Sequence, residues 1–351
     1  MHASDTRLLH VFKSFNIGGT EKSTILYSNH LSADFAFIGL FARKGVYDHS
    51  NIISQKLHQF FPPLNVGLNI FTWPLYLLRI IKIVRQHRIT VLNFHHRVFI
   101  PIIQCIKILH PSLKIIYTAH CCFNDAINRF IAADKIIAVS EAVRQDLCRN
   151  YKTNIVIIPH GVQAFSKGRL QHDGRTIGFV GRFEHRKGII PLINAAAILI
   201  RNNELRKLTL RGEGPLLKEI HAHIKKAGLE RNIVTERPQI GNNDDLFSGI
   251  DLLVVPSLLP EGFGLVIIEA MAAGIPVVGS DTTGINEIII DGYNGRLVPC
   301  GDVSALITAI RSIFDDKVFR ESLIANGHHT VSMKYKVAMT TSLYCRLMTE
   351  L

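Results

Sequence analysis

Short apolar runs rich in β-branched residues alternate with helical patterns from one end of the sequence to the other. In the first half the runs occupy residues 8–12, 35–41, 89–94, 114–118, 135–140 and 154–158. In the second half they occupy residues 176–180, 207–210, 232–235, 250–255 and 275–279. Strands that alternate with helices form parallel sheets with helices packed on their faces. The sequence therefore predicts an α/β fold in both halves.

The length of the chain favours two domains. A chain of 351 residues is longer than one hydrophobic core normally organises. Between the two series of strands, residues 163–175 are polar, contain two glycines and show no periodicity, so we place the interdomain linker there. The predicted domains are residues 1–165 and 166–330. Helical patterns follow the last strand, at residues 303–315 and 331–348.

The composition narrows the class of protein. Hydrophobic residues make up 47% of the chain and charged residues 19%, which describes a globular protein and excludes disordered and collagen-like chains. The first residues lack the apolar stretch of a signal peptide, and no uncharged apolar run approaches the roughly 20 residues of a membrane-spanning helix. The six cysteines show no metal-binding or disulfide spacing. We therefore expect a cytoplasmic protein with reduced thiols.

Positive charge is concentrated in the first half. Residues 1–165 contain 18 Lys and Arg against 8 Asp and Glu, whereas residues 166–351 contain 22 against 20. A basic half favours an anionic partner there, such as a membrane surface, a phosphate-bearing acceptor or nucleic acid.

A basic helix is expected at residues 74–88, after the aromatic residues Phe71 and Trp73. Its basic residues recur at every third position: Arg79, Lys82, Arg85 and Arg88. The pattern fits an interfacial helix with an aromatic anchor. An ordinary covering helix with a solvated basic face fits it equally.

The segment 255–274 carries the strongest chemical signal. A buried strand ends there in a turn of proline and glycine, and a helix begins near Gly264. Glu269 lies in that helix among apolar neighbours, so its carboxylate is expected to be at least partly buried and to need polar partners. Ribose hydroxyl groups would supply them, and the N–H groups of the turn and of the helix start suit a phosphate. Glu261 lies at the mouth of the turn; the competing interpretation makes both glutamates ordinary turn and surface residues.

A second strand, at residues 176–180, runs into a loop that presents Arg182 and Lys187 before an apolar helix. Parallel α/β sheets bind ligands at the carboxyl ends of their strands. The arginine fork and the lysine point charge together could neutralise a diphosphate leaving group as its bond breaks. Basic loop residues of this kind can also be solvated surface groups.

Three weaker signals lie in the first half. The pair Gly18-Gly19 follows the first strand and opens a helix, which permits close backbone approach to a ligand, although it lacks the dinucleotide and P-loop patterns. His120 ends a strand and is expected to point into a cleft, or to be structural. His95-His96 occupies a similar strand end without Glu or Cys at metal-ligand spacing, so we predict no metal site.

Together these segments resemble retaining glycosyltransferases of family 4, which have the GT-B architecture of two facing Rossmann-like domains with a cleft between them. The two-glutamate signature of that family is matched by Glu261 and Glu269. Its basic donor-phosphate pair is matched by Arg182 and Lys187.

The remaining motifs of the family follow in the same order. Its glycine turn is matched by Gly18-Gly19 and its active-site histidine by His120. Residues 158–162, 211–215 and 291–295 also fit. In one departure, Thr283 stands where such enzymes commonly have the first glycine of a Gly-Gly pair. The resemblance also implies that the last helix, at about residues 331–351, packs back on the N-terminal domain.

The resemblance implies transfer of a sugar with retention of its anomeric configuration, without a metal or a cofactor. The donor would be a nucleotide diphosphate sugar, with UDP-sugar favoured over GDP-sugar, bound mainly by residues 166–330. The acceptor, met by residues 1–165, would be a lipopolysaccharide, capsular or other lipid-linked glycan at the inner face of the cytoplasmic membrane. The expected donor-binding residues are Gly18, Gly19, Arg182, Lys187, Glu261, Gly262, Phe263, Gly264, Leu265 and Glu269.

The same resemblance implies a role for each catalytic candidate. Arg182 and Lys187 would stabilise the departing diphosphate. Glu269 would bind the ribose, and Glu261 the hydroxyl groups of the transferred sugar. His120 would bind a sugar hydroxyl from the other domain. The expected catalytic residues are thus His120, Arg182, Lys187 and Glu261.

Other functions remain open at this point. A nucleotide-sugar epimerase can share the architecture, but the two-glutamate segment speaks against it. A non-catalytic nucleotide-sugar binding protein would keep the donor contacts and lose His120 and the basic pair, which are present here. For a nucleic-acid binder the sequence shows no aromatic-basic recognition motif, so we expect no nucleic-acid partner.

Overall fold

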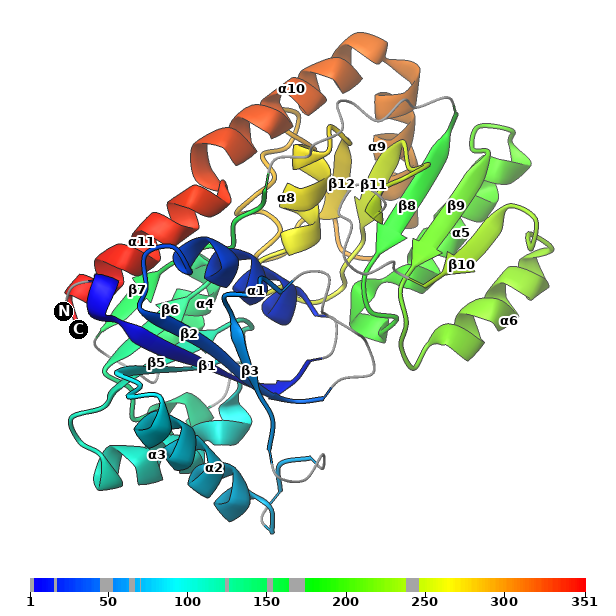
Figure 1. Cartoon of the computed structure of the whole chain (residues 1–351). Coiled ribbons are helices and arrows are strands. Elements are labelled where there is room, and N and C mark those ends of the chain that lie inside the picture. Colours follow the sequence, from blue (N-terminus) through cyan, green and yellow to red (C-terminus); the bar gives the residue numbers. More distant parts are fainter. Residues whose placement is uncertain are drawn as a thin grey trace. The chain divides into compact units, whose positions relative to one another are not determined.

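The computed structural model describes residues 3–15, 18–44, 53–62, 67–69, 71–123, 126–149, 154–163, 174–237 and 246–351. The chain divides into two compact units, of which the first comprises Met1–Gly161 with Val337–Leu351 and the second Val162–Lys336. Each unit is built on one parallel sheet with helices on its faces (Figure 1). The predicted class, two Rossmann-like α/β domains, is confirmed.

The first unit contains a seven-stranded sheet in the order β3-β2-β1-β4-β5-β6-β7. Its strands are β1 (Arg7–Ser14), β2 (Phe37–Arg43), β3 (His58–Phe60), β4 (Val91–Phe94), β5 (Lys114–Ala119), β6 (Lys135–Ala138) and β7 (Ile155–Ile157). Its α-helices are α1 (Gly19–Leu31), α2 (Trp73–Gln86), α3 (Ile100–Leu109), α4 (Glu141–Cys148) and α11 (Val337–Thr349). The central strands are buried on both faces, which explains their continuous apolar sequences.

The last helix, α11, packs on α1 within the first unit. The rings of Tyr344 and Tyr27 are stacked with centroids 4.5 Å apart, and the Tyr344 hydroxyl donates to the Tyr27 hydroxyl at 2.9 Å. The start of α11 approaches the backbone so closely that a Cβ at Gly161 would lie 2.6 Å from the Cα of Val337. Only glycine fits at position 161 without a shift of the helix.

The second unit contains a six-stranded sheet in the order β10-β9-β8-β11-β12-β13. Its strands are β8 (Thr176–Val180), β9 (Lys207–Arg211), β10 (Ile233–Glu236), β11 (Leu252–Val255), β12 (Val277–Ser280) and β13 (Arg296–Val298). Its helices include α5 (Ile189–Arg201), α6 (Leu217–Ala227), α8 (Leu265–Ala272), α9 (Val303–Asp315) and α10 (Lys317–Lys334). The apolar faces of α5 and α9 form its core with the middle strands.

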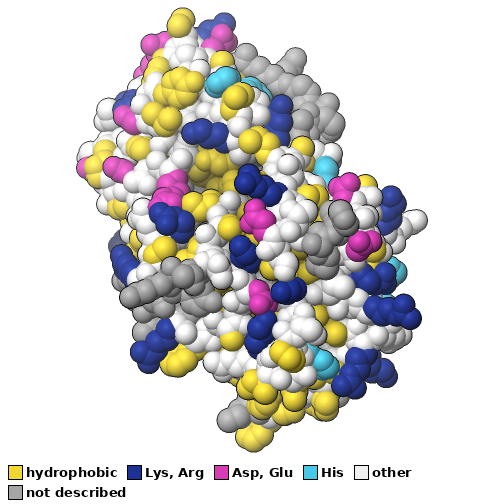
Figure 2. Space-filling view, turned by 90° about the vertical axis from the view of Figure 1, so that its left-hand side faces the viewer, with side chains coloured by type: hydrophobic (Ala, Val, Ile, Leu, Met, Phe, Trp, Pro, Cys, Tyr) yellow, Lys and Arg dark blue, Asp and Glu magenta, His cyan; other side chains and the backbone are white. Residues whose placement is uncertain are grey.

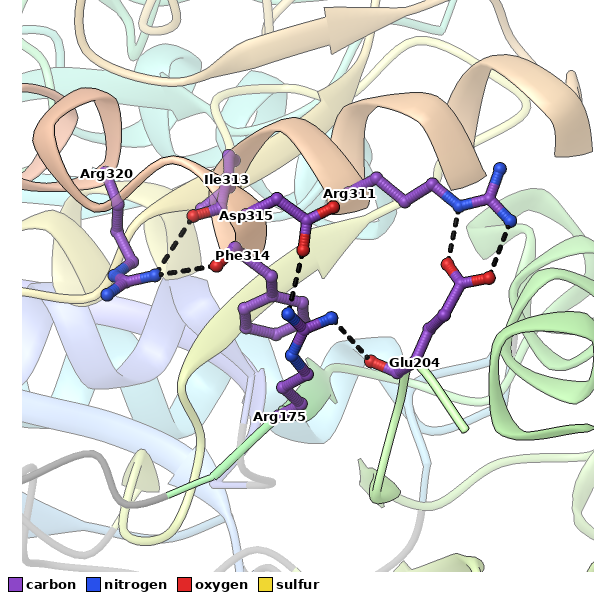
Figure 3. Close-up of polar contacts among 7 residues, drawn as sticks. All are labelled: Arg175, Glu204, Arg311, Ile313, Phe314, Asp315 and Arg320. Carbon is purple, nitrogen blue, oxygen red and sulfur yellow. Dashed lines mark hydrogen bonds and ion pairs between the residues drawn. The ribbon is translucent and has the colours of Figure 1, made fainter. Parts of the chain in front are cut away.

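Polar contacts anchor the end of α9 to the start of β8 (Figure 3). Arg175 donates to Asp315 Oδ1 at 2.8 Å and to the carbonyl of Glu204 at 3.3 Å. The Glu204 carboxylate accepts from Arg311 at 2.9 Å, and Arg320 donates to the last two carbonyls before Asp315 at 3.2 Å. Arg320 thereby pairs carbonyl groups that the helix leaves unpaired at its C-terminal end.

The structure differs from the sequence prediction at two edge strands and in the C-terminal helices. The edge strands β3 and β13 were not predicted, because each begins with a polar residue, whereas the equally short edge strand β7 is entirely apolar and was predicted. The single helix predicted at residues 331–348 is wrong, since α10 ends before Tyr335 and α11 begins at Val337. The Tyr335 carbonyl accepts from the N–H of Val162 at 2.8 Å, so backbone pairing with a distant segment interrupts the helix there. Of the predicted linker, residues 164–173 lie outside the described residues.

Candidate functional site

The turn between β11 and α8 is shaped by a left-handed residue. Gly264 adopts φ 90°, a conformation that residues with a Cβ rarely adopt, and α8 begins at the next residue. Within the described parts of the chain, no side chain caps this helix start. The N-terminus of α8 therefore keeps the partial positive charge that favours an anion.

Glu261, four residues before α8, is the centre of a charged cluster. Its carboxylate is nearly buried, at 7% exposure, and accepts from Lys187 Nζ at 2.7 Å and from the Ser257 hydroxyl at 2.6 Å. Arg186 Nη2 lies 3.4 Å from the other carboxylate oxygen. Two cations face one carboxylate, so this group of side chains keeps a net positive charge beside the helix start.

The loop that carries Lys187 is held against the turn by backbone contacts. Gly188 has φ 66°, and a Cβ there would lie 1.9 Å from the carbonyl oxygen of Pro256. The N–H of Leu258 donates to the Arg186 carbonyl at 2.8 Å. A residue larger than glycine at position 188 would push the two loops apart and lengthen the Lys187–Glu261 contact.

Arg182 occupies a different position in the same loop. Its side chain is 69% exposed and pairs with Glu184 at 3.0 Å. The backbone around it is fixed by the next loop, because a Cβ at Gly212 would lie 1.9 Å from the carbonyl oxygen of Gly181. Arg182 is thus an exposed cation on a fixed backbone, whereas Lys187 is held in place by Glu261.

The departure at position 283 leaves this backbone arrangement intact. The Thr283 carbonyl accepts from the N–H of Glu261 at 2.9 Å, which any residue type can do. The following Gly284 has φ 88°, and a Cβ there would lie 2.1 Å from the Glu261 carbonyl oxygen. Only the second position of the pair needs glycine in this chain.

Glu269 lies in α8 and is buried, at 5% exposure, as its apolar surroundings in the sequence predict. Its backbone carbonyl accepts from Ala273 at 3.0 Å at the end of the helix. A carboxylate at this depth in a short helix is costly unless it has polar partners. Glu261 and Glu269 both lie in the second unit, Glu261 in the turn before α8 and Glu269 within that helix.

The remaining predicted residues lie in the first unit. Gly18 precedes α1 and Gly19 is its first residue, while residues 16–17 lie outside the described part of the chain. His120 directly follows β5 and is half-buried. Its Nε2 lies 2.9 Å from His95 Nδ1, and its Nδ1 lies 3.4 Å from His160 Nε2. Burial, together with the neighbouring imidazoles, holds the pKa of His120 well below its ordinary value, so the ring is neutral.

Two models of known families match consecutive parts of the chain. Residues 17–164 match the model described as Glycosyltransferase Family 4, and residues 162–330 match the model described as Glycosyl transferases group 1. The boundary between the matches falls at the boundary between the two compact units. The chain belongs to glycosyltransferase family 4.

Curated relatives of this family 4 member match part of its length. A phosphatidyl-myo-inositol mannosyltransferase of Mycobacterium leprae is 32% identical over 207 residues, covering 56% of this chain and 54% of that protein. An uncharacterized glycosyltransferase of Methanocaldococcus jannaschii is 34% identical over 197 residues, with 56% and 54% covered. The chain thus spans about half the length of the curated relatives it matches.

Solved structures share the fold over the whole chain. HepE from Anabaena, in complex with UDP and glucose, is 18% identical with a TM-score of 0.83 and covers 99% of this chain and 100% of its own. The lipopolysaccharide outer core galactosyltransferase WaaB in its apo form is 15% identical with a TM-score of 0.71, covering 99% and 100%. At these identities the likeness establishes the GT-B fold alone.

Two residues of the charged cluster were missed from the sequence. Arg186 precedes Lys187 and could have been noticed as half of an Arg-Lys pair. Ser257 lies between prolines and leucines without any pattern, so only the fold reveals its contact with Glu261. His160 was noticed only as part of a matching segment, yet it lies beside the predicted His120.

The described residues contain neither a metal-binding cluster nor a membrane-spanning helix. In that part of the chain no three His, Cys, Asp or Glu side chains come together in a metal-binding arrangement. No described helix combines the length and the apolar character needed to cross a membrane. The six cysteines are free thiols.

Proposed function

We propose that this chain is a retaining glycosyltransferase that moves a hexosyl group from a nucleotide diphosphate sugar to a lipid-linked glycan. The observation that carries the proposal is the charged cluster at the start of α8, which consists of Glu261, Ser257, Lys187 and Arg186. It lies within the segment that matches the group 1 model. Net positive charge and an uncapped helix start are what a diphosphate leaving group needs.

We assign a role in donor binding to four residues of the second unit from their positions. Lys187 stabilises the diphosphate from a fixed position, and the exposed Arg182 closes on it when donor binds, releasing Glu184. Glu269, buried in α8, holds the ribose hydroxyls. Glu261 binds the transferred sugar through the carboxylate oxygen that faces Arg186 at 3.4 Å, since the other oxygen is occupied by Lys187 and Ser257.

The nucleotide is proposed to be uridine diphosphate. This choice is supported by HepE, whose structures contain UDP, UDP with glucose, and UDP-glucose. The reaction uses no divalent metal in this proposal, because Lys187, Arg182 and the α8 start supply the positive charge. A donor phosphate oxygen takes the proton of the attacking hydroxyl, so no side-chain base is required.

The acceptor is proposed to be anionic or to lie at an anionic membrane surface, reached at the cytoplasmic face. The names of two similar proteins support this proposal, the phosphatidyl-myo-inositol mannosyltransferase and the lipopolysaccharide outer core galactosyltransferase WaaB. The excess of 18 basic over 8 acidic residues in positions 1–165 supports it on physical grounds.

The exposed face of α2 offers a surface for such contact. Phe71, Leu75 and Leu78 are exposed, Phe71 at 86% and Leu78 at 63%, and Lys82 and Arg85 continue the same face. Within α2, spacings of three and four residues place Leu75, Leu78, Lys82 and Arg85 on one side of the helix, and Phe71 lies in the turn before it. Figure 2 shows hydrophobic side chains gathered at the lower end of its face, at the height of α2 and α3 in Figure 1, with basic side chains nearby.

Not every basic residue expected on this helix takes part. Arg79 turns its Nε toward the Phe61 carbonyl, to which it donates at 3.3 Å. The contribution of Lys82 and Arg85 is tested by liposome co-sedimentation of a variant with both residues changed to Gln. A variant with the exposed Lys225 and Lys226 of α6 changed to Gln is the control. Changing Lys82 and Arg85 to Gln should weaken binding to anionic vesicles by up to roughly 30-fold at low salt. Equal sedimentation of both double variants would leave α2 as an ordinary covering helix.

The proposed activity is tested by transfer of labelled sugar from a panel of nucleotide sugars to a lipid and glycan extract of the source cells. Lys187→Met should lower turnover by roughly 100-fold, the scale of losing one electrostatic donor, while Lys225→Met should not lower it. Release of free epimerised nucleotide sugar without transfer would indicate the epimerase alternative. Donor binding without any turnover would indicate a binding protein.

A further inference from the structure

Four histidines form a continuous row inside the first unit. His10 lies on β1, His95 follows β4, His120 follows β5 and His160 follows β7. His10 Nδ1 lies 2.9 Å from His95 Nε2, His95 Nδ1 lies 2.9 Å from His120 Nε2, and His120 Nδ1 lies 3.4 Å from His160 Nε2. His160 Nδ1 lies 2.6 Å from the hydroxyl of Ser23 on α1. Every link joins a δ nitrogen to an ε nitrogen until the row reaches the serine.

The sheet order explains why the row exists. β4 and β5 are adjacent parallel strands, so His95 and His120, which directly follow them, lie side by side. His10 lies in the middle of β1, the strand that pairs with β4 on its other side. His10, His95 and His160 are buried and His120 is half-buried. The rings of His120 and His160 stack with centroids 5.3 Å apart and an angle of 8° between their planes. Packing of this kind fixes each ring plane as well as each hydrogen bond.

Protons in such a row can be arranged in only two ways. A neutral imidazole has one N–H and one acceptor nitrogen, so each link forces the tautomer of the next ring. Desolvation lowers the pKa of His10 to about 3 and that of His160 to about 4, which keeps the rings neutral near pH 7. All N–H groups of the row therefore point either toward Ser23 or toward His10.

The buried end of the row decides between the two arrangements. His10 Nε2 has no hydrogen-bond partner among the residues that the structure describes. If the row pointed toward His10, this atom would carry a buried N–H without an acceptor, which native structures rarely contain. If the row points toward Ser23, the same atom keeps only an unshared electron pair. The second arrangement leaves the smaller defect and makes His120 donate from Nδ1.

We propose that His95 and His160 are positioning residues that hold His120 as the Nδ1–H tautomer and aim that N–H at a hydroxyl of the donor sugar. The inference rests on the proposed sugar contact of His120. Both ring nitrogens of His120 face histidines, but the two links differ: 2.9 Å to His95 is an ordinary hydrogen bond, and 3.4 Å to His160 is at the limit. A sugar hydroxyl replaces the long link, while His95 keeps the ring in place through the short one.

The tautomer is read by long-range proton–nitrogen correlation spectra of the full chain labelled with nitrogen-15 histidine. We expect His120 of the wild type to carry its proton on Nδ1 between pH 6 and 8. Its chemical shifts should stay nearly constant over this range, because the ring remains a neutral imidazole. Peaks are assigned with His120→Phe. A wild-type spectrum with the His120 proton on Nε2 overturns the inference without any variant, so the result does not depend on whether a variant folds.

Two substitutions at position 95 separate positioning from packing. Asparagine places its amide near the former Nδ1 and can still donate to His120, whereas glutamine reaches the former Nε2 and serves only His10. His95→Asn should keep the His120 tautomer, and His95→Gln should lose it and lower kcat/KM by roughly tenfold, the effect of one misplaced hydrogen bond. Equal behaviour of the two variants in both measurements overturns the proposal.

The same two substitutions at position 160 test the other neighbour of His120, and His58 on β3 provides a control. His160→Gln keeps a polar group at the nitrogen that faces His120, and His160→Asn keeps one only toward Ser23. The glutamine variant should retain more of the Nδ1–H signal than the asparagine variant, and His58→Gln, outside the row, should match wild type in both measurements. Unchanged transfer by His120→Phe would instead refute the proposed sugar contact, because the tautomer is read independently of activity.

Discussion

The contact between Lys187 and Glu261 gives the sharpest quantitative prediction. Lys187→Met keeps the aliphatic stem and removes the ammonium group that lies 2.7 Å from a carboxylate with 10% of its side chain exposed. Because Ser257 and Arg186 remain beside Glu261, the carboxylate keeps part of its pairing. The variant therefore tests whether the contact with Glu261 contributes to stability and so fixes the position of the lysine.

The magnitude follows from distance and burial. Opposite charges 2.7 Å apart attract by roughly 6 kcal/mol at an effective dielectric constant of about 20. Desolvation of the pair offsets most of this, so a charged hydrogen bond contributes a net 1.5–3 kcal/mol, and we expect a loss of about 2 kcal/mol in the free energy of unfolding. Arg182→Met, which removes an exposed side chain, should cost less than about 0.5 kcal/mol.

A double-mutant cycle with Glu261→Gln provides the assay. Urea unfolding of wild type, both single variants and the double variant should give a coupling energy of about 1.5–3 kcal/mol between Lys187 and Glu261. The same cycle with Arg182 in place of Lys187 is the matched control and should be additive within about 0.5 kcal/mol. Additive effects for Lys187 as well would refute the claim that Glu261 positions it.

Three further predictions concern ligand binding, metal and pH. Calorimetric titration with a nucleotide diphosphate should show a large loss of affinity for Glu269→Ala and a smaller one for Glu261→Ala, which affects the diphosphate only through its contact with Lys187; equal losses would contradict their separate roles. Transfer should continue in excess chelator, and loss that Mg²⁺ or Mn²⁺ restores would contradict a metal-free reaction. Burial lowers the pKa of His10 to about 3 and of His160 to about 4, so below pH 6.5 the unfolded chain binds protons first. Stability should then fall by roughly 1.4 kcal/mol per pH unit for each histidine, and an unfolding midpoint that is equal at pH 7.5 and pH 5 would contradict this.

The sequence predicted the fold well where each element has its own period. The strands with four or more apolar residues were all located, and the predicted helix 303–315 coincides with α9. β3 and β13 were missed because they lack the uninterrupted apolar run by which the equally short β7 was located. The break at Tyr335 was missed because the residue that pairs with it, Val162, is distant in sequence.

The site was predictable in its residue types and less so in its contacts. Burial of Glu269 follows from its apolar neighbours, and the need for glycine at position 188 follows from no sequence pattern. The pairing of Lys187 with Glu261 joins residues 74 positions apart through two loops. The histidine row arises from strand order in the first unit, which no local pattern encodes.

The central claim, that the second unit holds a nucleotide diphosphate sugar at the start of α8, is tested most directly by thermal unfolding with a panel of nucleotide diphosphates and nucleotide sugars. A ligand at about 100 times its Kd stabilises the native state by roughly 2.7 kcal/mol, which shifts the midpoint of a domain of this size by about 5–10 °C. We predict such a shift for uridine nucleotides with the wild type, and a much smaller one with Glu269→Ala. No shift for any nucleotide, or an equal shift for wild type and Glu269→Ala, would contradict the account.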